Sequence, residues 1–272
     1  MPTPSNGNSG SNLPDPPVDP AELSDAELLL ALESETKLAL ERVYQLEQPT
    51  PLDSVELENG CVLMLKREDL SQVHSYKWRG SFNKILSMHQ RGFTGAMVAA
   101  SAGNHAQGVA ITANRLKLKA TIYMPRSTPL LKQESVKQFG GEYAEIRLHG
   151  DSFDEAATEA KKFAAESGGA LIPPYDDLQV IAGQSTIGVE IADKLEQPPT
   201  HVFLEFGGGG MGAGVCSVVK RRFPDAKLIC VEAIDQDCMG VSIAKGERTT
   251  IENLDRFCDC LLYTSPSPRD RG

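Results

Sequence analysis

Residues 96–124 read AMVAASAGNHAQGVAITANRLKLKATIYM and contain three consecutive predicted elements. The apolar run at 96–100 predicts a buried strand, a helix-compatible segment follows at 104–116, and a second apolar run at 120–124 predicts another strand. A strand, a helix and a strand in so short a stretch are typical of a parallel βαβ unit. The polar SAGNHAQG segment lies where the first strand ends and the helix begins, where functional residues gather in such folds.

The same alternation extends over most of the chain. Further strands are predicted at 61–66, 142–148, 201–206 and 227–232. Further helices are predicted at 21–34 with Ser24 as N-cap, at 36–46, from Lys77 onward, and at 129–139, 152–166, 178–195 and 211–223. Strands and helices that alternate through short loops predict an α/β fold with a parallel sheet.

The charge is concentrated at one end of the chain. The 272 residues carry a formal net charge of -10, and residues 1–60 contain 12 acidic but only 2 basic residues. A nucleic-acid-binding protein would present a basic face, so no nucleic-acid partner is expected. Residues 1–20 are rich in Pro, Gly, Ser and Asn, and we do not expect them to fold alone.

Cysteine usage and hydropathy indicate the compartment. The 6 cysteines lie at positions 61, 216, 230, 238, 258 and 260, without a Cys-x-x-Cys pair or paired metal spacing. Free thiols in a reducing compartment are therefore expected, with no metal site. No apolar stretch approaches a membrane span, and the first 20 residues lack the features of a targeting segment. The expected location is the cytoplasm, with no membrane partner.

The first candidate site is Lys77, within the hexapeptide SYKWRG at 75–80. A lysine that forms a Schiff base has to lose its proton, and an apolar wall favours the neutral amine. Tyr76 and Trp78 supply aromatic neighbours. A surface lysine at a helix start is the simpler interpretation of any lysine taken alone, and here the flanking pattern argues against it. The adjoining run Lys66-Arg67-Glu68-Asp69 is predicted to be a salt-bridge cluster at a strand end.

The second candidate site opens the helix at 104–116. Gly103 permits close backbone approach, Asn104 can hydrogen-bond a ring oxygen or a carboxylate, and the helix N-terminus favours an anion. An ordinary capped helix is the alternative, because Ser and Asn are good caps. The residues predicted to contact substrate are Ser101, Ala102, Gly103, Asn104 and His105.

The third candidate site is a glycine loop between a strand and a helix. Consecutive glycines let backbone N–H groups converge on phosphate oxygens. The residues predicted to hold a phosphate are Gly207, Gly208, Gly209, Gly210 and Met211.

The same loop has a rival interpretation. Gly207, Gly209 and Gly212 satisfy G-x-G-x-x-G, and Glu232 follows at the end of the next strand. This is the fingerprint of a dinucleotide site, and taken alone it favours a nicotinamide-dependent oxidoreductase. The other two candidate sites favour a pyridoxal phosphate enzyme, because a dehydrogenase has no need of them.

Together these stretches resemble the threonine deaminase branch of the fold-type II pyridoxal phosphate enzymes. The hexapeptide is similar to the Ser-Phe-Lys-x-Arg-Gly-Ala motif, in which the lysine carries the cofactor; Tyr76 replaces Phe and Ser81 replaces Ala. Residues 101–108 match the family's substrate and ring loop, and IPPYDDLQVIAGQSTIGVEI at 172–191 is similar to its long signature. The resemblance covers roughly residues 50–259 and implies two parallel-sheet lobes with helices on both faces, the second of them incomplete.

The resemblance also implies a reaction. Pyridoxal 5'-phosphate would be the cofactor, held by Lys77, Tyr76, Asn104 and the glycine loop, and Lys77 would take the α-proton of the substrate. L-Threonine would give 2-oxobutanoate and ammonia as a first step of isoleucine biosynthesis, and L-serine would give pyruvate more weakly. Ala102 stands where related racemases often have serine, which favours elimination over racemisation. The full-length parent is expected to be a homo-oligomer.

The expected domains are an acidic extension at 1–35, a catalytic domain at 36–259 with a smaller lobe at about 84–172, and a tail at 260–272. The tail, CLLYTSPSPRDRG, resembles translated adapter sequence, so we expect it to be foreign and the catalytic domain to be truncated. A natural disordered tail is the alternative. A non-catalytic relative of the fold is the remaining functional alternative, and the intact Lys77, Asn104 and glycine loop argue against it.

Overall fold

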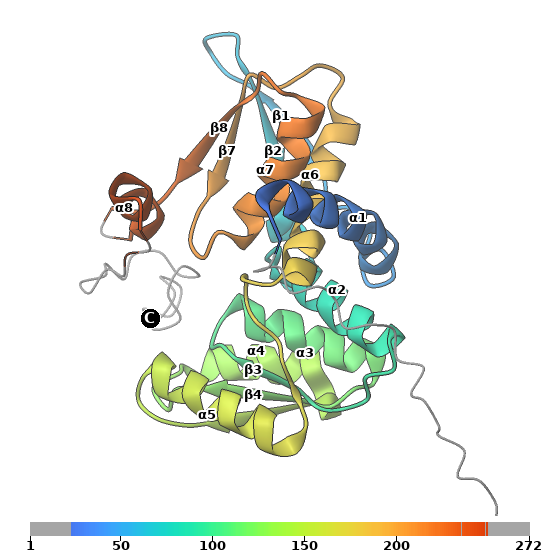
Figure 1. Cartoon of the computed structure of the whole chain (residues 1–272), viewed down its shortest axis with the longest axis vertical. Coiled ribbons are helices and arrows are strands. Elements are labelled where there is room, and N and C mark those ends of the chain that lie inside the picture. The colour runs from blue at the N-terminus through green and yellow to red at the C-terminus, as the bar shows by residue number, and fades with distance from the viewer. Residues whose placement is uncertain (1–22, 235, 248, 250–272) are drawn as a thin grey trace, which may run out of the picture.

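The computed structural model describes residues 23–234, 236–247 and 249. Its helices are α1 (Asp25–Val43), α2 (Lys77–Gln90), α3 (Asn104–Leu116), α4 (Leu130–Gly140), α5 (Phe153–Ser167), α6 (Leu178–Lys194), α7 (Gly210–Arg222) and α8 (Cys238–Lys245). Its strands are β1 (Leu52–Glu56), β2 (Val62–Lys66), β3 (Met97–Ala100), β4 (Ala120–Met124), β5 (Ala144–Leu148), β6 (Ala170–Leu171), β7 (His201–Glu205) and β8 (Lys227–Val231). Two 3-10 turns, η2 (Glu68–Leu70) and η3 (Gly141–Tyr143), complete the list. Figure 1 shows two groups of elements, with α2 between them.

The first group is a four-stranded parallel sheet covered on both faces. Its strand order is β5-β4-β3-β6. Met97 and Ala99 of β3 pack in the cluster that contains residues of α3 and α4, whereas Val98 packs against α5. Because successive side chains of a strand point to opposite faces, one short apolar strand supplies both layers. This confirms the predicted α/β class.

The second group contains β7 and β8, which are parallel, and the antiparallel hairpin of β1 and β2. Val215 and Val219 of α7 pack with Leu204 of β7 in one apolar cluster. Sequence patterns predicted β2 but not β1. Residues of β1 are half-buried or exposed and read LDSVE, so they carry neither the apolar run nor the clean alternation that identifies a strand.

The N-terminal helix differs from expectation. The helices predicted at 21–34 and 36–46 form one helix, α1, and the predicted break near Glu35 is wrong. No Gly or Pro interrupts the sequence there. The Thr36 hydroxyl donates to the Leu32 carbonyl one turn earlier, at 2.7 Å, so its hydrogen bond is made within the helix. The predicted cap is confirmed: Ser24 and Glu27 form a capping box. Residues 1–22 and the predicted tail lie outside the described residues.

Among the described residues, no helix combines the length and the apolar character that crossing a bilayer requires.

Helix α2 lies at the centre of the molecule and crosses α6 at close range (Figure 1). A Cβ atom added to Gly183 of α6 would lie 2.5 Å from the Arg79 carbonyl oxygen and 2.7 Å from the Gly80 Cα. Both partners are backbone, so the contact has no flexible side chain that could yield. The crossing therefore requires glycine on α6.

We predict that Gly183→Ala lowers the free energy of unfolding by about 1–3 kcal/mol, because the added methyl group overpacks the crossing. Urea unfolding followed by circular dichroism measures it. The matched control is Lys194→Ala on the exposed side of α6, which should change stability by less than about 0.5 kcal/mol. Equal unfolding curves for the two variants would contradict the close approach.

Candidate active site

Lys77 is the first residue of α2, and its side chain is buried. Its Nζ donates to the carbonyl oxygen of Pro174 at 3.1 Å. The same Nζ lies 5.5 Å from the ring centroid of Tyr76 and 5.9 Å from that of Tyr175. Lys77 therefore has aromatic surroundings on two sides, one predicted from sequence and one not.

The predicted substrate loop lies at the carboxyl end of β3. Ser101 is fully buried, and its Oγ accepts from the Gly103 amide at 3.2 Å. Gly103 is the N-cap of α3, Asn104 is its first residue, and Ala102 is buried before it. The loop thus presents the N-terminus of a 13-residue helix, whose amides favour an anion.

His105 is fully buried within α3, and its ring Nε2 lies 2.8 Å from the Ile172 carbonyl oxygen, to which it donates. Burial, together with the positive charge of Lys77, lowers the pKa of His105 from 6.5 to about 4. The imidazole is therefore neutral at neutral pH. Its ring contacts a backbone carbonyl, and its predicted contact with substrate stays a prediction.

The glycine loop lies at the carboxyl end of β7. Gly209 is the N-cap of α7 and has a φ of +82°, a conformation that favours glycine. Gly210 and Met211 begin the helix and are buried, and Gly207 is the first residue of the loop. The ring of Tyr175 packs directly on Gly208, where a Cβ atom would lie 2.7 Å from the ring carbon Cδ2.

A short segment brings the three predicted stretches together. We call residues 172–177 the bridging segment. The Ile172 amide donates to the Val98 carbonyl of β3 at 2.8 Å, and its carbonyl accepts from His105. The Pro174 carbonyl accepts from Lys77, and the Tyr175 ring packs on Gly208 of the glycine loop.

The bridging segment ends at Asp177, the N-cap of α6. Its carboxylate accepts from the Gln179 and Val180 amides at 2.9 and 3.1 Å and pairs with Lys84 of α2 at 2.7 Å. The segment is therefore anchored to β3, α2 and α6. The family signature at 172–191 includes this segment without predicting its contacts, although two prolines and an aromatic residue after a short strand are a local signal of a functional loop.

The rival dinucleotide interpretation meets an obstacle at Glu232. Its carboxylate accepts from the Met239 amide at 3.0 Å and from the Gly240 amide at 2.8 Å. The acid that would bind a ribose is thus occupied at the N-terminus of α8. Among the described residues, no cluster of three or more His, Cys, Asp or Glu side chains could hold a metal ion.

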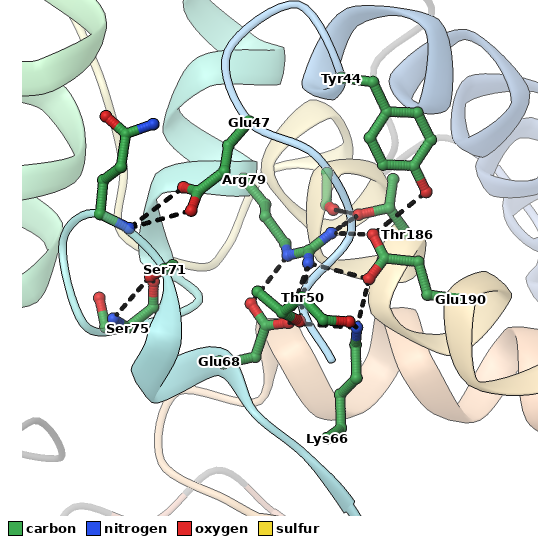
Figure 2. A network of polar contacts seen from close by, with 12 residues as sticks. Tyr44, Glu47, Thr50, Lys66, Glu68, Ser71, Ser75, Arg79, Thr186 and Glu190 are labelled. Atoms are coloured by element: carbon green, nitrogen blue, oxygen red, sulfur yellow. Dashed lines mark hydrogen bonds and ion pairs between the residues drawn. The ribbon is translucent and has the colours of Figure 1, made fainter. Parts of the chain in front are cut away.

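A buried charge network surrounds Arg79, which lies two residues after Lys77 on α2 (Figure 2). Arg79 is fully buried, and its guanidinium donates to both oxygens of Glu68, with Nε–Oε2 at 2.8 Å and Nη2–Oε1 at 2.9 Å. It also donates to both oxygens of Glu190, at 2.5 and 3.0 Å, and to the Thr186 hydroxyl at 3.0 Å. Burial alone would lower the pKa of Arg79, but the two carboxylates outweigh it and raise that pKa above its ordinary value.

The network extends to three further residues, Lys66, Thr50 and Tyr44 (Figure 2). Lys66 at the end of β2 lies 2.5 Å from Glu190 and donates to the Thr50 carbonyl at 2.6 Å. The Thr50 hydroxyl donates to Glu68 at 2.5 Å. Tyr44, which follows α1, donates to Glu190 at 3.1 Å, and burial with the nearby carboxylate raises its pKa. The salt-bridge cluster predicted at the end of β2, residues 66–69, is confirmed. Its partner Glu190 on α6 was not predicted.

Comparison with known proteins places the chain in a well-populated group. The family model described as "Pyridoxal-phosphate dependent enzyme" matches residues 43–271. The biosynthetic L-threonine dehydratase of Haemophilus influenzae is 41% identical over 80% of this chain, and the chloroplastic biosynthetic threonine dehydratase of Arabidopsis thaliana is 38% identical over 88%.

The chain spans only about two fifths of these relatives, 42% and 40% of their lengths. A solved structure of the processed form of threonine deaminase isoform 2 from Solanum lycopersicum is similar, with a TM-score of 0.80 and 35% identity. The match covers 91% of this chain and 71% of that one.

We predict that Arg79→Met destabilises the chain by about 3–5 kcal/mol, because it leaves two buried carboxylates, Glu68 and Glu190, with only the single charge of Lys66 between them. Arg67 offers a matched control. It pairs with Asp53 and Asp69 at 2.8 Å near the surface, so Arg67→Met should cost much less stability than Arg79→Met. Urea unfolding of both variants measures the difference, and similar losses would argue against the network.

We further predict a pH effect from His105. The unfolded chain protonates His105 near pH 6.5, whereas the folded chain resists protonation until about pH 4. The contribution of His105 to the free energy of unfolding is therefore fully present above pH 6.5. About 3 kcal/mol of it is lost as the pH falls toward 4.

His105→Gln keeps a donor for the Ile172 carbonyl and removes the titration. Urea unfolding at a series of pH values should show a steeper acid loss for the parent chain than for this variant. Parallel curves would contradict the neutral, buried imidazole.

Proposed function

Because the chain belongs to the family of pyridoxal-phosphate dependent enzymes, we propose that it contains the cofactor-binding centre of an ammonia-lyase that acts on L-threonine. The products would be 2-oxobutanoate and ammonia. The observation that carries this proposal is the position of Lys77, buried at the start of α2 and linked by the bridging segment to the glycine loop. The relatives named threonine dehydratase and threonine deaminase support the substrate.

The residues present fit pyridoxal 5'-phosphate. Lys77 offers an amine between two aromatic rings, which matches a flat aromatic aldehyde. Gly208 and Gly210 offer backbone without side chains, and the first amides of α7 attract an anion such as a phosphate. Tyr76 and Asn104 lie at the starts of α2 and α3. When bound, the cofactor would withdraw electrons from the α-carbon of the substrate.

The protein's own groups would perform the remaining tasks. We assign to the Lys77 amine both the attachment of the cofactor and the removal of the α-proton. The α3 N-terminus, with Ser101 and Asn104, would bind the substrate carboxylate through its amides and dipole. The neutral His105 would hold this loop against the bridging segment. L-Serine lacks the methyl group of threonine and would lose about 1–3 kcal/mol of apolar contact, so it would react more weakly.

Several expectations stay predictions: elimination rather than racemisation at Ala102, the role in isoleucine biosynthesis, the domain boundaries, the homo-oligomer and the cytoplasmic location. The word biosynthetic in the names of relatives favours the role in isoleucine biosynthesis. A nicotinamide-dependent oxidoreductase is the second candidate function, and the engagement of Glu232 at α8 argues against it.

We predict that Lys77→Ala abolishes covalent attachment of pyridoxal 5'-phosphate, because no other amine lies between the Tyr76 and Tyr175 rings in the described part of the chain. The chain is mixed with cofactor, reduced with borohydride and analysed by peptide mass spectrometry, and in parallel 2-oxobutanoate formation is assayed.

The matched control is Lys161→Ala, on the exposed face of α5, which should retain the label on the peptide that contains Lys77. Label that persists in Lys77→Ala would contradict the assignment. NADH binding by the parent chain, with no cofactor label, would favour the oxidoreductase.

A further inference from the structure

Tyr175 is the one aromatic side chain of the bridging segment, and it contacts two of the predicted binding stretches. Its ring packs on Gly208, and its backbone lies close to Gly210, where an added Cβ would be 2.8 Å from the Tyr175 carbonyl oxygen. The same ring lies 5.9 Å from Lys77 Nζ. The ring therefore adjoins both the lysine and the glycine loop.

The shape of the adjoining cavity gives a second observation. A cavity of about 310 Å³ lies beside the glycine loop and is lined by Tyr175, Phe206, Gly208, Cys216 and Met239, among others. Of the described residues, neither Lys77 nor Asn104 is part of its lining. Tyr175 is therefore a wall of this cavity and also a neighbour of the lysine outside it.

We propose that the Tyr175 ring controls access of the cofactor phosphate to the glycine loop, and that it has to leave Gly208 before the phosphate reaches the loop amides. This inference rests on the proposed function. It assigns to Tyr175 a role in cofactor loading. The group of the cofactor whose entry Tyr175 controls is the phosphate, not the pyridine ring.

The backbone at this position suits a rotation of the side chain alone. The Tyr175 carbonyl accepts from the Asp177 amide at 3.0 Å, and the preceding Pro174 has a fixed φ and a carbonyl engaged by Lys77. With the backbone held on both sides, the ring can move only about its own side-chain bonds. Such rotamer changes of partly exposed side chains are fast compared with loop rearrangements.

The closed position has identifiable stabilising contacts. A cation within about 6 Å of an aromatic face is attracted to it, and the Lys77 ammonium meets this condition. Packing on Gly208 adds apolar contact. If the open arrangement is populated at about a tenth, the rate of phosphate entry falls about tenfold relative to a chain without the ring.

The first test measures cofactor association with Trp78, the single tryptophan of the chain, as reporter. Trp78 is buried next to Lys77, so bound cofactor should quench its fluorescence. Stopped-flow mixing with pyridoxal 5'-phosphate should give a rate about tenfold higher for Tyr175→Ala than for the parent chain, because the barrier ring is gone. Tyr175→Phe keeps the ring and is the matched control, with the rate of the parent chain.

Phosphate-free pyridoxal separates this role from a merely structural one. Its association should be equal in all three proteins, because it does not need the glycine loop. An equal acceleration with pyridoxal, or an unchanged or slower rate with pyridoxal 5'-phosphate, overturns the inference and leaves the proposed function standing. No quenching in any of the proteins overturns both.

The second test examines the contact between the Tyr175 ring and Gly208 in the absence of cofactor, and it measures protein stability. Gly208 does not have a positive φ, so Gly208→Ala is disfavoured by its collision with the Tyr175 ring rather than by its backbone. We expect Gly208→Ala to lower the unfolding midpoint in the parent chain and to have little effect in Tyr175→Ala. Equal effects in both backgrounds overturn the inference, even if Tyr175→Ala alone proves too unstable for kinetics.

Discussion

The fold of this chain depends on a buried guanidinium that two carboxylates enclose. Arg79 has no exposure to solvent. The negative charges of Glu68 and Glu190 balance the two positive charges of Arg79 and Lys66. A charge buried in this way is tolerated only when it is paired and fully hydrogen-bonded. Because the partners come from η2, β2 and α6, any other arrangement of these elements would leave a charge without compensation.

The position of the candidate site follows from this constraint. Arg79 is held two residues beyond Lys77, so the start of α2, which carries the lysine, is fixed relative to α6. The glycines at the crossing bring the two helices into backbone contact. The bridging segment then connects this rigid pair to the parallel sheet, because the Pro174 carbonyl accepts from Lys77 and the Ile172 amide donates to the Val98 carbonyl of β3. Its two prolines have no amide hydrogen, so they offer acceptors without requiring any.

Sequence patterns predicted the parts of this structure that local periodicity encodes. The helix at 104–116 and the strand at 120–124 were predicted with the bounds that the structure gives, because apolar spacing identifies them. The exposed strand β1 was missed for lack of such spacing. The predicted site stretches lie around the bridging segment, but their roles stay predictions. Tyr175 and the contact of Arg79 with Glu190, 111 residues away, depend on tertiary packing that no local pattern contains.

The two groups of elements differ in how they are distributed along the chain. The four-stranded sheet is continuous, since all its strands lie between residues 97 and 171. The other group is assembled from segments on both sides of that stretch, and its charge network joins Thr50 and Lys66 to Glu190. Contacts between distant segments require large loops to close before they contribute, whereas local pairing does not. During synthesis, the sheet is therefore able to form as it leaves the ribosome, whereas Lys66 and Arg79 lack their partner Glu190 until α6 has been made.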